Sequence, residues 1–225
     1  GYGNLTKYIA DAKPKKIYAI EKDKKLFSFL NNKFGNNKMI EIYNEDALNF
    51  IKRTNKEKNI IVFGNLPYNI STQILASLIM LKKWPPWYKQ LIFMFQKEVA
   101  DRIIAKTDSK NYGRLSIISN WKLDIKKIID IKPISFTPIP KVDSTLLIFE
   151  PKKNFFKLKE AKSLEKITRV FFNQRRKKIK KPMKTLFNNY ENIAKKLNLN
   201  LDLRPQNLDF ETYFKITEEF EKLRK

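Results

Sequence analysis

The 225-residue sequence contains neither cysteine nor histidine. Their absence excludes thiolate nucleophiles, histidine general bases and histidine-oriented triads, and it removes every common zinc site except one built from carboxylates. Any chemistry must therefore use Asn, Asp, Glu, Tyr, Lys or backbone groups, and we expect no bound metal. No apolar run reaches the roughly 18 residues that a membrane span needs, and no signal-peptide pattern opens the chain. These absences predict a cytoplasmic protein without a membrane anchor.

Acidic residues are also scarce. The chain carries 47 Lys and Arg against 23 Asp and Glu, which gives a formal net charge of +24. A charge of this size indicates a polyanionic partner, either nucleic acid or an acidic membrane surface. Abundant Lys, Asn and Ile point to a codon bias that inflates lysine, but such a bias does not explain the shortage of acids. We therefore favour nucleic acid.

The hydrophobic pattern predicts α/β organisation in the first two thirds of the chain, as βαβ units around a mostly parallel sheet. Strands are expected at 16–21, 39–43, 60–63 and 91–96, and an edge or hairpin strand at 144–149. Helices are expected at 23–34, 71–81 and 97–104. From about Pro151 a Lys-rich helical pattern takes over, and the last 74 residues hold 21 basic and 9 acidic side chains. The sequence thus predicts a Rossmann-like domain over 1–150 and a small basic helical domain over 151–225.

Two acids follow predicted strands, downstream of a glycine-rich start. Gly1-Tyr2-Gly3 is typical of a strand-to-helix turn in nucleotide-binding folds, and because no strand precedes it we expect the first strand of the fold to be missing. Glu21 ends the next strand, where such folds hydrogen-bond a ribose diol, although a solvated acid is the simpler alternative. Asp46 ends the following strand and could accept a hydrogen bond from an adenine amino group or cap a short helix. Together they favour a cofactor that carries adenosine.

The most specific motif in the chain is Asn65-Leu66-Pro67-Tyr68. The exocyclic amine of adenine is a poor nucleophile because its lone pair is delocalised, and two acceptors aimed at its hydrogens would localise that pair. The Asn65 side-chain carbonyl and the Leu66 backbone carbonyl can supply them, and Pro67 makes the arrangement rigid. Tyr68 offers a flat face on which a flipped base can stack. The alternative is an ordinary proline turn with a tyrosine facing the core.

The order of the motifs along the chain resembles that of a known enzyme family. GYGNLT, AIEKD, NEDAL and FGNLPYNIST are similar to successive motifs of the S-adenosylmethionine-dependent ribosomal RNA adenine N6,N6-dimethyltransferases. The similarity continues through MFQKEVADRI, YGRLS and FTPIPKVDS to FFNQRRKKIKK and LRPQNL. Of the two subfamilies, NLPY, PKVDS and the NQRRK tail resemble the KsgA type, which modifies small-subunit RNA, more than the Erm type, which modifies large-subunit RNA.

The resemblance also implies roles for individual residues. Glu21 would hold the cofactor ribose, and Asp46 with Ala47 would contact its adenine. Asn65 and Tyr68 would serve the target amine and base, with Asn65 also next to the cofactor. The remaining implied residues are Phe136, which would help to sandwich the flipped adenine and is otherwise a loop anchor, and Gly1, which would approach the methionine end. Because the acidic-x-Gly start of the first motif is absent, we expect that end of the pocket to be incomplete.

A cluster of cations marks the tail. Seven positive side chains fall within ten residues without an acid: Arg175, Arg176, Lys177, Lys178, Lys180, Lys181 and Lys184. A solvated helix face is the alternative, but the mutual repulsion of such dense charges is relieved by a phosphate backbone. We therefore expect this cluster to bind RNA, which the family resemblance implies is ribosomal RNA of the small subunit. We also expect the protein to act as a monomer. Two rival functions stay open, a non-catalytic RNA-binding assembly factor and a DNA adenine methyltransferase.

Overall fold

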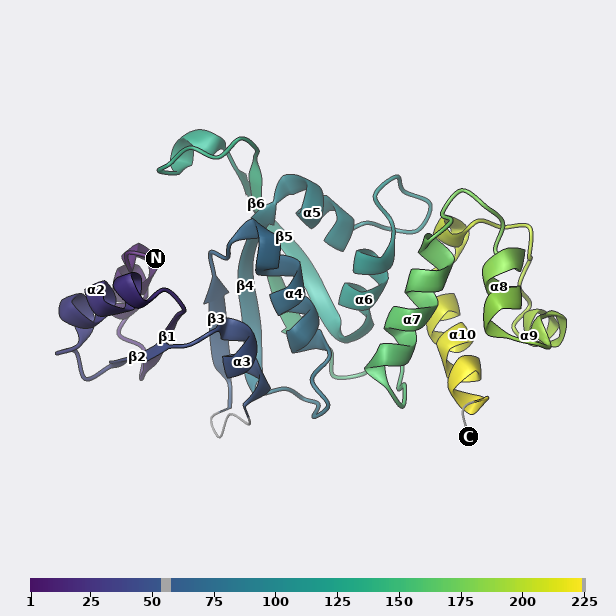
Figure 1. Ribbon diagram of the computed structural model, residues 1–225, viewed down its shortest axis with the longest axis horizontal. Helices are drawn as coiled ribbons and strands as arrows, with labels where there is room; N and C mark the ends of the chain where they lie inside the picture. The colour runs from purple at the N-terminus through teal and green to yellow at the C-terminus, as the bar shows by residue number, and fades with distance from the viewer. Residues whose placement is uncertain (54–57, 224–225) are drawn as a thin grey trace. The chain divides into compact units, whose positions relative to one another are not determined.

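A computed structural model describes residues 1–53 and 58–223 of the protein (Figure 1). The chain forms two compact units, Gly1–Asn55 and Lys56–Lys225, and each has its own sheet. This division lies nearer the N-terminus than the boundary near Pro151, which stays a prediction. Within the described residues, no helix is long and apolar enough to cross a membrane.

The first unit is built on two parallel strands. Strand β1 (Ile17–Glu21) pairs with β2 (Ile40–Asn44), and helices α1 (Asn4–Asp11), α2 (Lys24–Phe34) and α3 (Ala47–Lys52) accompany them. Gly3 precedes α1 with a φ of 76°, and a Cβ there would lie 2.6 Å from the Phe34 ring and 2.7 Å from the Leu30 side chain. Only glycine fits this position, because both the backbone conformation and the space exclude a side chain.

The second unit contains a four-stranded mixed sheet in the order β3-β4-β6-β5. Its strands are β3 (Ile60–Gly64), β4 (Tyr88–Gln96), β5 (Leu123–Ile131) and β6 (Ser144–Pro151). β3 and β4 are parallel, whereas β6 runs antiparallel to both β4 and β5. The expectation of an edge strand at 144–149 is therefore wrong, because β6 is hydrogen-bonded on both sides. The hairpin alternative is correct, since β5 and β6 are consecutive and antiparallel.

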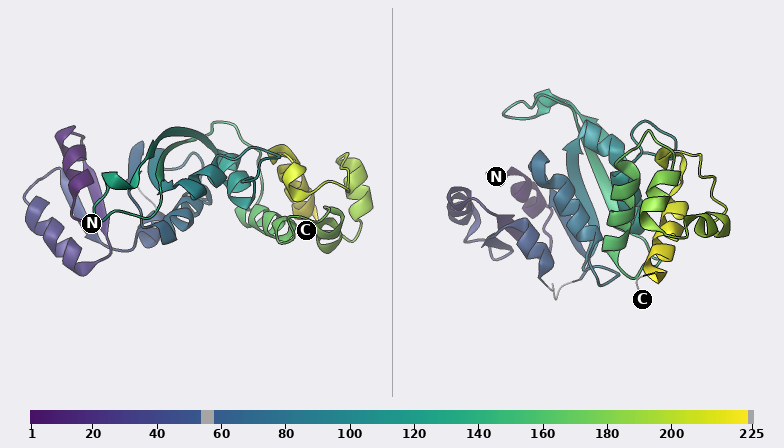
Figure 2. Two further views of the ribbon diagram at one scale, coloured as in Figure 1. Left: turned by 90° about the horizontal axis from the view of Figure 1, so that it is seen from above. Right: turned by 45° about the vertical axis from the view of Figure 1, so that its right-hand side comes forward.

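Three helices cover one face of this sheet, α4 (Tyr68–Ile79), α5 (Lys97–Ile103) and α6 (Arg114–Lys122) (Figures 1 and 2). The core between sheet and helices contains alternating strand residues that are almost completely buried: Leu91, Phe93, Phe95, Leu147 and Phe149. The rings of Phe93, Phe95 and Phe149 pack together with centroids 6.0–6.3 Å apart. Aromatic packing of this kind fixes the sheet that ends at the candidate site.

Two elements of the second unit were not predicted from the sequence. β5 lies at the edge of the sheet, and its central residues Lys126 and Lys127 interrupt the apolar alternation that identifies a strand. Charged side chains are common on edge strands because they discourage further pairing. Helix α6 has Ile117, Ile118 and Trp121 buried on several sides, so it lacks the one-sided pattern of a surface helix.

The C-terminal part is helical, as expected. It consists of α7 (Ala161–Phe172), α8 (Lys180–Leu186), α9 (Tyr190–Lys196) and α10 (Phe210–Lys222), with a 3-10 turn at Pro205–Asn207. α7 contacts both α6 and α10, and the Phe171 and Tyr213 rings meet at 5.4 Å. The tail is thus joined to the sheet layer through α6. The last two residues of the predicted tail domain lie outside the described residues.

Candidate active site and RNA-docking surface

Glu21 and the Asn44–Asp46 segment lie together in the first unit. Parallel pairing places Glu21 opposite Asn44, and the Asn44 amide donates to the Glu21 backbone carbonyl at 3.0 Å. The Gly1 amino group donates to the Glu21 carboxylate, whose other oxygen accepts from the Asp23 amide at 2.9 Å. The structure therefore brings Gly1, Glu21 and the end of β2 to the same edge of the small sheet.

Asp46 has two partners. One carboxylate oxygen accepts from the Leu48 amide at 2.8 Å and caps α3, which begins at Ala47. The other accepts from Lys22 Nζ at 2.9 Å. The helix cap that the sequence left as an alternative is thus present, and a ligand amine would compete only with Lys22, whose side chain is 77% exposed.

Both acids are held in the charged form. Burial favours neutral Glu21, but the hydrogen bonds from the Gly1 amine and the Asp23 amide outweigh it and lower the pKa of Glu21. The hydrogen bond from Lys22, followed by that from the Leu48 amide, lowers the pKa of Asp46. A groove of about 680 Å³ lined by residues 21–25 adjoins the Glu21 carboxylate. An ionised acceptor beside a groove is suited to a ribose diol.

Asn65, Leu66 and Pro67 form the short turn between β3 and α4 in the second unit. Gly64 ends the strand, and a Cβ there would lie 2.8 Å from the Phe93 ring and 2.9 Å from the Leu66 side chain. The missing side chain lets the turn pack closely against the sheet. Asn65 is exposed, and among the described residues nothing hydrogen-bonds its side chain. Its amide is therefore available to a ligand.

Pro67 and Tyr68 start α4. Pro67 has φ −53° and ψ 131°, and its carbonyl accepts from the Ile70 and Ser71 amides, so the helix begins three residues before the predicted start at Ser71. The half-buried Tyr68 ring is held by its hydroxyl, which is 2.8 Å from Ser144 Oγ at the start of β6. Sequence reasoning missed Ser144, although it ends the FTPIPKVDS motif, because only the folded sheet brings the two motifs together.

Phe136 lies in the same unit, on the segment that joins β5 to β6. This segment contains the 3-10 turn Pro133–Ser135 and projects beyond the end of the sheet (Figure 1). Its base is tied down by Lys132, which donates to Asp143 at 2.7 Å, and by the Asp143 carbonyl, which accepts from the Lys97 amide at 2.9 Å. Phe136 is half-buried and has no ring contact with Tyr68 within the described residues. A base-sandwiching role for Phe136 stays a prediction.

The tail cations divide into two groups. Arg175 is half-buried, and its guanidinium donates to the carbonyls of Ser109 and Lys110, at 3.3 and 2.5 Å, and to the Gln206 side chain at 3.2 Å. Lys178 donates to Asp202 at 2.8 Å, and Lys184 lies over the Tyr190 ring at 5.3 Å. The second group is exposed and has no ion pair among the described residues: Arg176, Lys177, Lys180 and Lys181.

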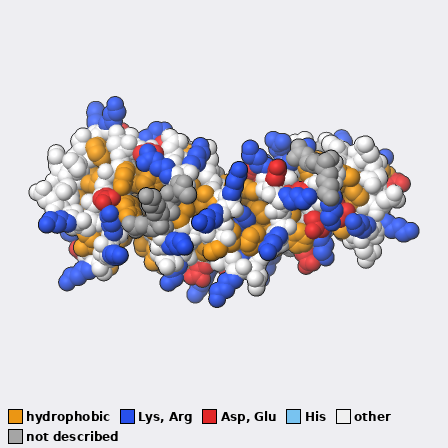
Figure 3. All heavy atoms as spheres, turned by 90° about the horizontal axis from the view of Figure 1, so that it is seen from below, with side chains coloured by type: hydrophobic (Ala, Val, Ile, Leu, Met, Phe, Trp, Pro, Cys, Tyr) orange, Lys and Arg blue, Asp and Glu red, His pale blue; other side chains and the backbone are white. Residues whose placement is uncertain are grey.

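Basic side chains are not confined to this cluster. Figure 3 shows Lys and Arg scattered over the whole of one face of the molecule, with few acids between them. The net charge of +24 therefore produces a broadly positive surface, on which the cluster at 175–184 is one dense region. Such a surface attracts polyanions over distances of about a Debye length, roughly 8–10 Å in physiological salt.

Comparison with known proteins assigns the family. A family model described as "Ribosomal RNA adenine dimethylase" matches residues 1–222. The chain belongs to this family. It is 54% identical over 224 residues to the "Ribosomal RNA small subunit methyltransferase A" of Pelagibacter ubique, covering all of this chain and 85% of that protein. The protein of the same name from Prochlorococcus marinus is 36% identical over 233 residues, and the match covers all of this chain and 84% of that protein. The resemblance to the small-subunit type is thus confirmed.

Two solved structures confirm the Rossmann-like α/β fold. A dimethyladenosine transferase from Plasmodium falciparum superposes with a TM-score of 0.78 at 26% identity, covering 99% of this chain and 87% of that one. The 23S rRNA methyltransferase ErmE has the same fold, with a TM-score of 0.67 at 18% identity, and covers 98% of this chain and 88% of its own. Membership of a methyltransferase family implies that a methyl donor is used.

Proposed function

We propose that this chain transfers methyl groups from S-adenosylmethionine to N6 of adenines in small-subunit ribosomal RNA, producing N6,N6-dimethyladenine during ribosome assembly. The observation that carries the proposal is the turn after β3, where an exposed Asn65 without an internal partner precedes a rigid Pro67 and a fixed Tyr68. A turn of this composition suits an amine that must be held by acceptors at its hydrogens. The names of the relatives, rRNA adenine dimethylase and small-subunit methyltransferase, support this substrate.

The chemistry requires little from the protein beyond placing acceptors. Asn65 Oδ1 and the Leu66 carbonyl accept the two amine hydrogens, which directs the nitrogen lone pair out of the ring plane and toward the methyl donor. Pro67 keeps the Leu66 carbonyl in place, because it restricts Leu66 to extended conformations. Such preorganised polar groups are the usual source of large rate enhancements. A second transfer proceeds with one N–H left to hold.

The cofactor would be held by the first unit. Glu21 is suited to its ribose, Asp46 and Ala47 to its adenine, and Gly1 to its methionine end. When bound, S-adenosylmethionine supplies an electrophilic methyl group on a sulfonium. The charged state of Glu21 and Asp46 supports the proposal, since an ionised carboxylate accepts hydrogen bonds more strongly than a neutral acid.

Glu21→Ala and Asp46→Ala are each expected to weaken S-adenosylmethionine binding about ten- to a hundredfold, the value of one hydrogen bond to a charged group. RNA affinity should stay unchanged, because neither acid belongs to the cations proposed to bind the RNA backbone. Isothermal titration calorimetry with the cofactor, and anisotropy with a labelled rRNA fragment, measure the two affinities. Glu41→Ala, in the strand between them, is the matched control. Unchanged cofactor affinity in both variants would contradict the assignment.

The internal contacts narrow the choice of RNA-binding cations. Arg175 has its guanidinium occupied by Ser109, Lys110 and Gln206, so we propose that it fixes the tail against the 106–113 loop. Lys178 is already paired with Asp202 at 2.8 Å, so it would have to exchange one anion for another. The cations that remain for the RNA backbone are Arg176, Lys177, Lys180 and Lys181.

Arg175 and Arg176 form a natural pair of test positions. Arg176→Gln with Lys177→Gln should lower the slope of log K against log salt by about 1.4–1.8, because two phosphate contacts are lost. Arg175→Lys keeps the positive charge, so it should leave the slope unchanged. It loses the planar guanidinium that bonds to several acceptors at once, so it should lower the free energy of unfolding by about 1–2 kcal/mol. Arg176→Lys should change neither quantity. A slope that falls for Arg175→Lys but not for the double variant would reverse these roles.

A methyl-transfer assay with labelled S-adenosylmethionine and small-subunit RNA tests the proposed function directly. Digestion of the product and mass spectrometry should show N6,N6-dimethyladenosine at a defined position. RNA binding without transfer would identify an assembly factor instead. Transfer to large-subunit RNA or to DNA, in preference to small-subunit RNA, would favour the Erm-type and DNA-modifying alternatives.

A further inference from the structure

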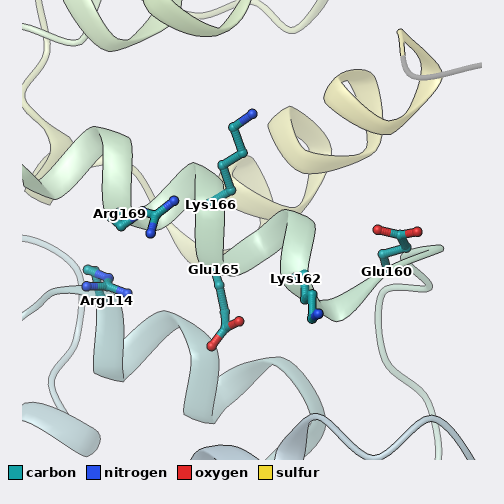
Figure 4. A pocket seen from close by; sticks show the side chains of 6 residues that line it. All are labelled: Arg114, Glu160, Lys162, Glu165, Lys166 and Arg169. Atoms are coloured by element: carbon teal, nitrogen blue, oxygen red, sulfur yellow. The ribbon is translucent and has the colours of Figure 1, made fainter.

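A second positively charged site lies apart from the 175–184 cluster, in a cleft between α6 and α7. The cleft has a volume of about 500 Å³ and is lined by Arg114, Glu160, Lys162, Glu165, Lys166 and Arg169. Arg114 is the first residue of α6, and the others lie at the start of α7 or along it. Figure 4 shows Arg114 and Arg169 at the same end of the cleft, on opposite walls.

Three cations of this cleft have no ion-pair partner within the described residues. Arg114, Lys162 and Arg169 form no ion pair within residues 1–53 and 58–223, whereas some lysines elsewhere in the tail do. On α10, Lys215 bonds to Glu211 and Lys222 to Glu218, at 2.8 and 3.0 Å. Lys166 also lines the cleft, but its ammonium lies over the Phe220 ring at 4.8 Å and points away from Glu165 in Figure 4. Two exposed guanidinium groups therefore face one space, and neither forms an ion pair with Glu160 or Glu165, the two acids that also line the cleft.

We propose that this cleft, formed by Arg114, Lys162 and Arg169, binds the phosphate backbone of the RNA as a docking point additional to the 175–184 cluster. The inference rests on the proposed function for the identity of the polyanion. Guanidinium groups bind phosphate oxygens through two parallel hydrogen bonds, and a pair of them on opposite walls suits a phosphate between them. A rigid position follows from the fold, since α6 packs on the sheet and α7 packs on α6.

Glu165 carries a negative charge that should oppose phosphate binding in the cleft. It is half-buried and points from α7 toward α6 in Figure 4, so its charge lies beside the proposed phosphate position. A carboxylate there repels a phosphate and weakens its binding. Neutralising Glu165 should therefore tighten RNA binding, whereas neutralising the arginines should weaken it. A structural role for these residues predicts no such opposite effects.

The test measures binding of in vitro transcribed small-subunit RNA over a range of salt concentrations. Arg114→Gln with Arg169→Gln should weaken binding by roughly 5- to 30-fold at 0.1 M salt and reduce the salt slope by about 0.7–1.8. Glu165→Gln should tighten binding by roughly two- to fivefold. The controls remove the same charges from α10: Lys215→Gln with Lys222→Gln, and Glu218→Gln.

The controls should change affinity by less than about twofold, because their net charge effect is screened. Thermal unfolding of each variant checks that the fold is retained. Arg114→Lys with Arg169→Lys should keep most of the slope of log K against log salt, because both charges remain. An unchanged slope in the arginine double variant, an equal change in the controls, or weaker binding by Glu165→Gln would overturn the proposal. Methyl transfer by the unmodified chain tests the proposed function separately, so failure of one is distinguishable from failure of the other.

Discussion

Asn65→Ala is expected to lower kcat for methyl transfer by about 100- to 1000-fold, the cost of removing one preorganised polar group at a reacting atom. The variant should bind RNA and cofactor with nearly unchanged affinity, because the acceptor matters most as the amine changes geometry in the transition state. Asn65 is exposed and has no hydrogen bond inside the described structure, so its loss should not disturb the fold. Single-turnover transfer at saturating RNA and cofactor measures this effect.

Tyr68→Phe is the matched control for Asn65→Ala. It changes the same turn but removes only the hydroxyl that bonds to Ser144. We expect transfer within a few fold of the unmodified chain, because the proposed role of Tyr68 is stacking, whereas Tyr68→Ala should lose about 1–3 kcal/mol of base binding. A normal transfer rate for Asn65→Ala, or an equal loss of rate in Tyr68→Phe, would show that the Asn65 side chain has no specific role in methyl transfer.

Predictions from sequence succeeded where a local pattern determines the structure. The apolar runs at 60–63 and 91–96 were recognisable as strands from composition alone. The expectation that 60–63 is a central strand buried on both faces is wrong, because β3 lies at the edge of its sheet and leaves Ile61 and Phe63 exposed. Glu21 and Asp46 could be placed at the same edge of the small sheet, because polar side chains at the ends of neighbouring parallel strands meet at one edge. The proline turn at 65–68 likewise follows from the restricted φ of one residue.

Other features depend on contacts between distant segments, which no local pattern reveals. Charge density alone made Arg175 look like its neighbours, yet only the fold shows that its guanidinium meets two carbonyls more than sixty positions away. In the same way, Tyr68 and Ser144 are 76 positions apart. Helix α6 escaped prediction because burial on several sides removes the periodicity that marks a helix at a surface.

Lys122, the last residue of α6, is the most consequential of these hidden features. Its side chain is buried, with a relative exposure of 6%. The ammonium donates to the carbonyls of Ile79 and Leu81, both at 3.3 Å, where α4 ends. It also lies over the rings of Trp121 and Trp84, at 4.3 and 4.9 Å. No carboxylate bonds to it within the described residues, so its charge is buried without a counter-ion.

This burial lowers the pKa of Lys122 to about 8 from an ordinary value of 10.5. Below pH 8 the lysine is charged in both the folded and the unfolded chain, and the folded state bears the cost of the buried charge. Between pH 8 and 10.5 the folded lysine loses its proton while the unfolded one keeps it. Because the unfolded state then binds more protons, the free energy of unfolding rises with pH in this window.

Lys122→Met should therefore abolish a rise of roughly 2–3 kcal/mol in the free energy of unfolding between pH 7 and pH 10, at 1.36 kcal/mol for each unit of pKa shift. Urea unfolding of the variant and of the unmodified chain at pH 7 and pH 10 measures this effect. The difference between their free energies of unfolding should change between the two pH values. Burial also lowers the pKa of Lys152, but that contribution is common to both proteins and cancels.

Lys126→Met, which removes an exposed lysine from the adjoining strand β5, is the control and should follow the unmodified chain at both pH values. If Lys122→Met shows the same difference from the unmodified chain at pH 7 and pH 10, Lys122 does not titrate in this window. The two carbonyls and the indole rings would then stabilise its ammonium as well as water does, and the junction of α4 and α6 would not depend on pH.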